Sequence, residues 1–80
     1  MTSHVVIDYA AAEGAVLRML GLIERRGFRV RAIAMSEEGE AGSLALDLQS
    51  NGPNRPLDVL ALQLGRLHEV RHVSIPGISS

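Results

Sequence analysis

The hydrophobic period alternates between two and 3.6 residues along the chain, and the order of the changes restricts the fold. Alternation with a period of two predicts strands over residues 4–9, 29–37, 43–50 and 70–75. Apolar residues at helical spacing predict one helix over 14–26 and a second from Pro56 to about Leu67. The expected order is therefore βαββαβ, with short connections. Right-handed crossovers then place both helices on one face of a four-stranded antiparallel sheet, an α+β, ferredoxin-like arrangement.

In two of the predicted strands, the sequence also indicates which residues share a face of the sheet. In the third strand Leu44, Leu46 and Leu48 alternate with more polar residues, which predicts one dry face and one wetter face. In the second strand, strict alternation places Ile33 and Met35 on one face. The same alternation places three other residues on the opposite face: Val30, Ala32 and Ala34.

Composition sets further limits. Eighty residues form a single domain, 1–80, with a core over about 4–76 and a short tail at 77–80. A chain of this size buries only about 60% of its unfolded surface, so an oligomer would stabilise it. The net charge is −1 without a basic block, which argues against nucleic acid as a partner. No run is apolar enough for a signal peptide or a membrane span, so the expected compartment is the cytoplasm.

The stretch from His68 to His72 reads HEVRH, a literal match to the zinc-protease motif H-E-x-x-H. That motif binds zinc only on a helix, where residues i and i+4 share a face. Here Gly65 precedes it and a β-branched run follows, so the pattern favours a helix end leading into a strand. Beyond His72 the chain also offers no further ligand, and no metal site is expected.

Other hosts of this topology fit the residues poorly. An RNA-recognition module needs aromatic residues on its central strands, and these strands carry aliphatic and small polar residues instead. A metal carrier of this fold would use paired cysteines, and the chain has none. An acylphosphatase-like enzyme needs a catalytic Arg and Asn in its first loop, and the Ala10 to Gly14 turn supplies neither.

One host fits better. The stretch "EGAVLRMLGLIERRGFRVRAIAM" resembles the ACT domain of acetolactate synthase small subunits, whose pattern is roughly P-G-x-L-x-R-x-x-G-L-F-x-R-R-G-[FY]-N-I-x-S-L. The matching residues are Gly14, Arg18, Gly21, Leu22, Arg25, Arg26, Gly27 and Phe28. A second segment resembles the family's Q-L-x-K-L-x-x-V-x-x-V, through Gln63, Leu64, Arg66, Leu67, Val70 and Val73. The resemblance covers about residues 4–76 and is greatest to the short, isozyme II type.

The resemblance implies a non-catalytic regulatory subunit of acetolactate synthase, an enzyme of valine, leucine and isoleucine biosynthesis. Such a subunit forms a homodimer through its ACT domains, and it binds and activates the large catalytic subunit. The thiamine diphosphate, flavin (FAD) and Mg²⁺ of that family belong to the catalytic subunit, so no cofactor is expected on this chain.

The family's effector site is the part of the resemblance that departs most from the pattern. By resemblance it would include Ala11, Ala12 and Gly14, together with Arg29 and Val30 from the neighbouring subunit. Family members place an Asn at the positions of Ala11 and Arg29, and these amides hold the amino acid effector. Because both are missing, we expect weak valine binding or none.

Alternatives remain open on the sequence alone. One is a free-standing ACT domain that senses another small amino acid and regulates a different enzyme. Another is a small enzyme that uses a histidine (His4, His68 or His72), although the three fit surface or strand-edge positions better. Gly21 either lets another chain approach or is a tolerated surface glycine. The arginine cluster either meets an acidic partner or forms a solvated face: Arg25, Arg26, Arg29 and Arg31.

Overall fold

A computed structural model describes residues 2–52 and 56–76, and the predicted tail at 77–80 lies outside these ranges. The six elements, in chain order, are β1 (Thr2–Ala10), α1 (Ala15–Arg25), β2 (Phe28–Glu38), β3 (Ala41–Ser50), α2 (Leu57–Gly65) and β4 (Val70–Ser74). Each differs from its predicted bounds by two residues or fewer at either end.

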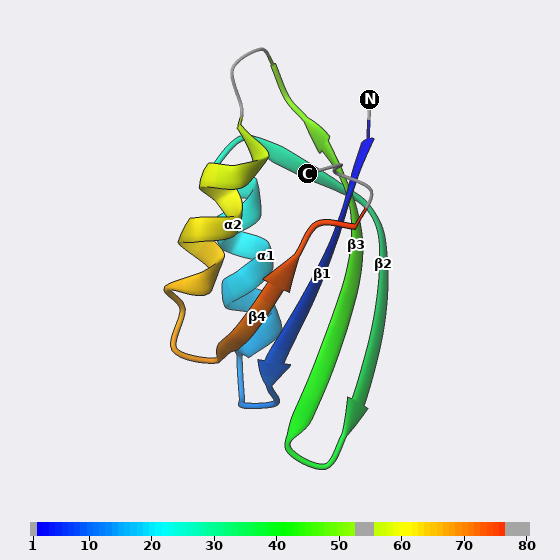
Figure 1. Cartoon of the computed structure of the whole chain (residues 1–80), viewed down its shortest axis with the longest axis vertical. Helices are drawn as coiled ribbons and strands as arrows, with labels where there is room; N and C mark the ends of the chain where they lie inside the picture. The colour runs from blue at the N-terminus through cyan, green and yellow to red at the C-terminus, as the bar shows by residue number, and fades with distance from the viewer. Residues whose placement is uncertain (1, 53–55, 77–80) are drawn as a thin grey trace.

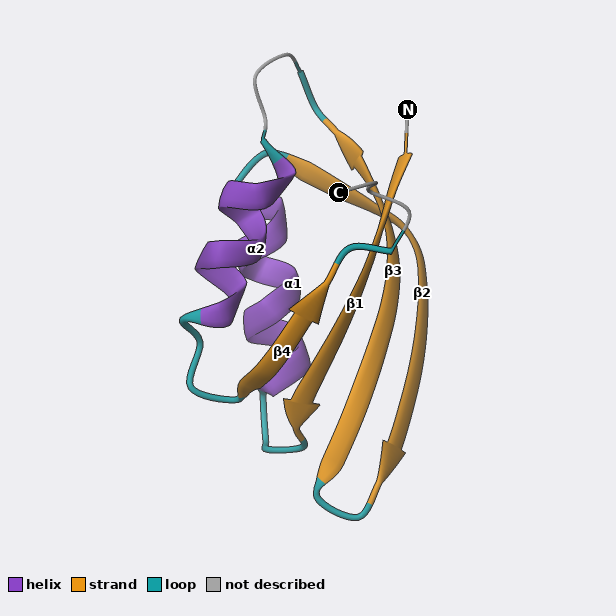
Figure 2. Ribbon diagram, viewed as in Figure 1, coloured by secondary structure: helices purple, strands orange, loops and turns teal. Residues whose placement is uncertain are grey.

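The four strands form one antiparallel sheet in the order β2-β3-β1-β4. Both helices lie against the same face of this sheet, and the other face is left open (Figures 1 and 2). This is the predicted βαββαβ, ferredoxin-like fold, and the prediction is confirmed. Strands β2 and β4 are the two edges of the sheet.

The core lies between the sheet and the helices and is almost entirely aliphatic. Leu44, Leu46 and Leu48 are fully buried on the helix side of β3, as their alternation predicts. Strand β1 and the helices supply the remaining buried residues: Val5, Ile7, Tyr9, Ala15, Met19, Leu22, Ile23, Leu60 and Leu64, joined by Phe28 at the start of β2.

Helix α1 ends as its sequence predicts. Gly27 has φ of 87°, a left-handed conformation that favours glycine, and its N–H donates to the carbonyl of Glu24. The chain then turns back toward the sheet, so that Phe28 packs in the core with 4% of its surface exposed. This turn fixes the direction in which β2 leaves the helix.

The predicted faces of β2 are partly wrong. A register shift between Val30 and Ala32 places Val30 opposite Leu48 and Ile33 opposite Leu46, on the helix side of the sheet. Val30 and Ile33 therefore share a face, because the bulge inserts one residue, Arg31, and interrupts strict alternation. Sequence alternation alone contains no sign of such an insertion.

The outer half of β2 is uncovered. Residues 31–38 are all exposed, and the end of the β2–β3 hairpin extends past the helices (Figure 1). Ile33 and Met35 pair with buried leucines of β3, yet they are 48% and 56% exposed. The helices pack over the middle of the sheet, so the edge strand keeps an apolar surface open to solvent.

Candidate functional site

The turn between β1 and α1 is hydrogen-bonded to two distant parts of the chain. The N–H of Ala10 donates to the carbonyl of Glu69 at 2.7 Å, and the N–H of Ala11 donates to the carbonyl of Glu40 at 2.9 Å. One bond reaches the connection before β4, and the other reaches the tip of the β2–β3 hairpin. The turn is therefore held in place from both sides.

Gly14 closes this turn and begins α1. It adopts φ 78° and ψ 0°, in the left-handed region, and it occupies the N-cap position without a side-chain cap. Ala15 donates to the carbonyl of Ala12, and the first turn of α1 carries no acidic residue. The helix start thus presents backbone N–H groups that no side chain caps, which suits an anionic group on a ligand.

Arg18 connects this turn to the start of β4. Its guanidinium donates to the carbonyl of Glu13 at 3.1 Å and pairs with the carboxylate of Glu69. The bond from Arg18 lowers the pKa of Glu69 below the usual range of a glutamate. The sequence pattern identifies Arg18, but Glu69 is 51 positions away and only the fold reveals it.

Tyr9 lies below the turn, at the end of β1. Its ring is buried, and its hydroxyl donates to Glu37 Oε2 at 2.7 Å. Burial, and then the bond to the Glu37 carboxylate, raise the pKa of Tyr9 to about 12. Gly42 lies between these two residues on β3, where a Cβ would come within 2.4 Å of the ring. The row Tyr9–Gly42–Glu37 joins the central strand to the outer half of β2.

The predicted effector residues fall into two separate groups. Ala11, Ala12 and Gly14 lie together in the β1–α1 turn. Arg29 and Val30 lie at the opposite end of the sheet, because Val30 pairs with Leu48, which pairs with Ser3. Eight residues of extended chain separate Ser3 from Ala11, or about 26 Å. One chain does not bring the two groups together, so they could meet only through a second copy.

The arginines of the predicted cluster are all exposed, and two of them contact glutamines. Arg26 donates to Gln63 at 3.3 Å, and Arg31 donates to Gln49 at 2.8 Å. Arg29 lies beside Arg31 on β2. The first half of β2 is therefore basic, whereas its last two residues are Glu37 and Glu38.

The HEVRH stretch does not form a helix. Helix α2 ends at Gly65, His68 lies in the following turn and His72 lies on β4, as predicted. His4 is within 2.6 Å of Asp47 on the open face, where both side chains are exposed. Over residues 2–52 and 56–76, no three His, Cys, Asp or Glu side chains gather as metal ligands. None of the helices within those ranges is long and apolar enough to cross a bilayer.

Comparison with known proteins agrees with this architecture. A model of the ACT domain family matches residues 11–73. The chain belongs to the ACT domain family. ACT domains are regulatory and non-catalytic, and they generally bind small-molecule effectors and partner enzymes. A search of curated protein sequences finds no match.

Several solved structures share the fold. The ACT domain of GTP pyrophosphokinase from Chlorobium tepidum superimposes with a TM-score of 0.77 at 16% identity, over 92% of this chain and 95% of that one. The small subunit of acetolactate synthase from Thermotoga maritima gives 0.78 at 22% identity, over 98% of this chain. The C-terminal domain of the MgtC protein from Mycobacterium tuberculosis gives 0.69 at 20% identity, over 91% of this chain and 82% of that one.

The coverage differs among these structures. This chain spans half of the Thermotoga small subunit, whereas it spans nearly all of the Chlorobium ACT domain. At these identities the likeness concerns the fold, which ACT domains of unlike proteins share. A particular regulatory role must therefore be argued from the residues of the turn and of the sheet edges.

Proposed function

We propose that this ACT domain is a regulatory subunit of acetolactate synthase that binds the catalytic subunit and raises its activity in branched-chain amino-acid biosynthesis. The observation that carries this proposal is the run from Gly14 to Phe28, which resembles the small-subunit pattern without a gap. Its members have defined positions: Gly14 is left-handed, Arg18 holds the turn, and Gly27 directs Phe28 into the core. We propose the cytoplasm as the compartment, because the catalytic subunit that this domain would bind is expected there.

We also propose that the chain forms a homodimer through β2. An antiparallel pairing of two β2 strands centred on Ile33 brings the start of each strand, which carries Arg29 and Arg31, beside the end of the other copy, which carries Glu37 and Glu38. The basic end of each strand then faces the acidic end of its partner, and opposite charges across strands are favourable. The pairing also covers the exposed side chains of Ile33 and Met35.

This dimer would complete the effector site. Antiparallel pairing brings Arg29 and Val30 of one copy to the end of the sheet where Ala11, Ala12 and Gly14 of the other copy lie. Backbone N–H groups at the start of α1 then have room for the carboxylate of an amino acid. The amide side chains that would orient it are replaced by Ala11 and Arg29, so the proposal includes weak valine feedback or none.

The chemistry of acetolactate formation is assigned entirely to the catalytic subunit. Thiamine diphosphate, FAD and Mg²⁺ would be bound there, and this chain would contribute contacts alone. Within the residues that the structure describes, no charged side chain is buried, and the three histidines are exposed.

A second candidate function is suggested by the superposition on the Chlorobium ACT domain over 92% of this chain, because that domain belongs to a different enzyme. In this alternative the domain senses another small amino acid and regulates an enzyme other than acetolactate synthase. Stabilisation of the isolated chain by an amino acid, without a large partner, would distinguish this candidate from the first.

Reconstitution tests the first candidate directly. Purified chain is added to the acetolactate synthase catalytic subunit of the same organism, and product formation from pyruvate is followed with and without valine. We expect clear activation that valine does not reverse. An absence of both activation and co-elution would refute the subunit assignment and favour the sensor. Activation that low-millimolar valine abolishes would refute the prediction made from Ala11 and Arg29.

A further inference from the structure

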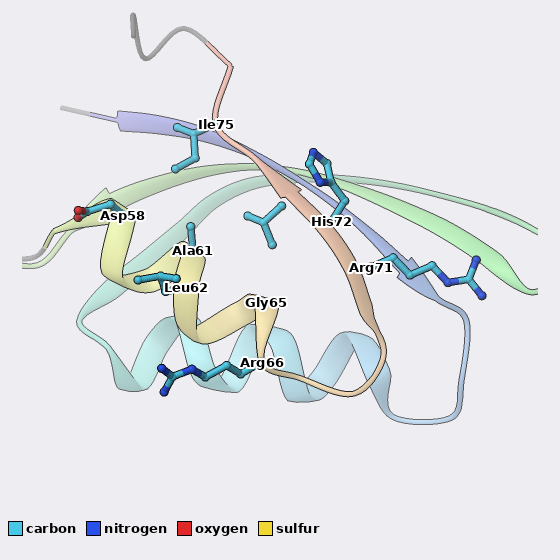
Figure 3. A pocket seen from close by; sticks show the side chains of 9 residues that line it. Asp58, Ala61, Leu62, Gly65, Arg66, Arg71, His72 and Ile75 are labelled. Atoms are coloured by element: carbon cyan, nitrogen blue, oxygen red, sulfur yellow. The ribbon is translucent and has the colours of Figure 1, made fainter.

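An open hollow of about 530 Å³ lies between α2 and β4, away from the turn and from β2 (Figure 3). Its floor is apolar. Ala61 and Ile75 face one another across it (Figure 3), Val73 also lines it, and Leu62 borders it with 65% of its surface exposed. A hollow of this kind holds small apolar side chains from a partner better than it holds a charged metabolite.

Strand β4 forms one wall of this hollow and is also an edge of the sheet. It pairs with β1 on one side, and no other described strand pairs with it on the other. Its start is fixed by Glu69, which accepts the bond from Ala10 and pairs with Arg18. A short edge strand held in this way is a ready site for the addition of one more strand.

The rim of the hollow is mainly basic. Arg66, Arg71 and His72 line it, while Asp58 at the opposite end is its one acidic residue among those described. The side chains of Arg66 and Arg71 extend outward from the rim (Figure 3). Neither arginine makes a salt bridge within residues 2–52 and 56–76. Long side chains of this type keep their charge in water and can turn toward an acidic partner.

A second copy of the chain is a poor occupant. Antiparallel pairing of two β4 strands centred on His72 would place the two histidines directly opposite each other, with Arg71 of each copy one position away. The two Arg71 guanidinium groups would then lie close to the two-fold axis, and like charges brought together across a strand pair are destabilising. The basic rim instead fits a segment of opposite charge.

We propose that β4 and the hollow beside it bind an extended acidic segment of the enzyme that this domain regulates. The segment adds a strand to β4, its apolar side chains enter the hollow beside Ala61 and Ile75, and its carboxylates meet Arg66 and Arg71. Only the source of the segment rests on the proposed function: if this domain regulates acetolactate synthase, the segment belongs to the catalytic subunit.

A peptide experiment tests the surface without the catalytic subunit. The probe is an acetylated, amidated hexapeptide that alternates valine with glutamate, and the control is the same peptide with lysine for glutamate. Both are titrated into the full-length chain while backbone amide resonances are followed by NMR. We expect saturable shifts at Val70–Ser74 and around Leu62, and affinity about fivefold or more higher than for the lysine peptide. Equal affinity for the two peptides, or shifts confined to β2, would overturn the proposal.

Two matched pairs of variants connect this surface to the catalytic subunit. Arg71→Glu reverses a charge on the rim, whereas Arg71→Lys keeps that charge. Leu62→Asp places a carboxylate at the hollow, whereas Leu17→Asp does so at a leucine that is 74% exposed and does not line it. All three positions are exposed, so the variants are expected to fold.

The outcomes separate this inference from the proposed function. The first member of each pair is expected to weaken binding of the catalytic subunit at least about fivefold, and the second to leave it unchanged. If the wild-type chain binds the peptide but not the catalytic subunit, the subunit assignment fails and the acidic-segment site stands. If it binds the catalytic subunit and all four variants bind equally, the site fails and the subunit assignment stands.

Discussion

The two edges of the sheet expose unlike surfaces. Strand β2 has eleven residues, with arginines near its start, two glutamates at its end and exposed Ile33 and Met35 in between. Strand β4 has five residues beside α2, with Arg71 and His72 at its centre and an apolar hollow along it. A two-fold dimer requires each end of a strand to complement the other end. Only β2 has that property, so we expect β2 to bind a copy of the chain and β4 to bind a different, acidic partner.

This difference has a physical origin in how the helices cover the sheet. The β2–β3 hairpin extends past both helices, which leaves a long edge open on either side (Figure 2). Strand β4 is short and has α2 next to it, so a partner strand would also contact a helix. A flat exposed edge suits a symmetric strand pair, whereas an edge with a hollow beside it favours partner strands whose side chains fit the hollow.

The largest effect is expected from Gly42→Ala, which disturbs the contact that joins β1 to the β2 edge. The new Cβ would lie 2.4 Å from the buried ring of Tyr9, so the ring and the hairpin must shift. Overpacking of this kind costs about 2–3 kcal/mol in the free energy of unfolding, measured by urea denaturation. Hydrogen exchange should quicken in β2 more than in β4.

Gly21→Ala is the matched control for that variant. Apart from the neighbouring backbone of α1, no described atom lies within 4 Å of a Cβ at Gly21, and alanine is favoured over glycine in a helix. We expect the free energy of unfolding to rise by up to about 1 kcal/mol. Equal destabilisation by the two variants would show that the ring contact at Gly42 is not the cause.

The second prediction compares the two edges of the sheet as sites of homodimer formation. Ile33→Glu should raise the dissociation constant of the homodimer about tenfold or more, because pairing would bury an unpaired carboxylate near the two-fold axis. Leu62→Glu makes the same chemical change beside β4 and should leave that constant unchanged. Sedimentation velocity over a concentration series measures both. If Leu62→Glu dissociates the dimer and Ile33→Glu does not, the roles of the two edges are reversed.

The third prediction uses the hydrogen bond that joins β1 to β2. Tyr9→Phe removes the hydroxyl that donates to Glu37 but keeps the ring. A hydrogen bond to a charged acceptor contributes at least about 1.5 kcal/mol to the free energy of unfolding. We expect the free energy of unfolding to fall by about that amount near neutral pH. Glu24→Gln, on the exposed side of α1, serves as a control that should change little.

The same bond predicts a loss of stability at high pH. The pKa of Tyr9 is raised in the folded chain to about 12, above the value of about 10 expected when it is unfolded. The stability that this shift contributes is present below pH 10 and is lost as the pH rises toward 12. The chain has no lysine, no cysteine and one tyrosine, so phenolate absorbance follows this group alone. A constant unfolding free energy from pH 9 to 12 would contradict the assignment.

The smallest effect is expected at the start of β4. The pKa of Glu69 is lowered by Arg18, so the stability from this pair is present at neutral pH and is lost as the pH falls through the lowered pKa of Glu69. The pair lies at the surface, and exposed ion pairs contribute little. Glu69→Gln should therefore lower the unfolding midpoint less than Tyr9→Phe does. It should also speed amide exchange at Ala10, while exchange in the outer half of β2 stays the same.

The elements of the fold could be predicted because they depend on local patterns. Leucines at every second position define β3, helical spacing defines α1 and α2, and Gly27 ends α1 through its own backbone freedom. The short connections then restrict the topology to one arrangement. The bulge at Arg31 could not be predicted in this way, because it depends on the register between β2 and β3 rather than on either strand alone.

The candidate site could be predicted only in part. The sequence by itself located the β1–α1 turn and indicated Arg18 and Gly14, because both residues belong to a continuous local pattern that resembles the family's. Only the tertiary structure decided that Arg18 meets Glu69, that Tyr9 meets Glu37 past Gly42, and that Arg29 lies far from Ala11. It also decided which strands became edges. These are contacts between residues distant in sequence, and their partners are set by sheet order and helix packing, which no local pattern records.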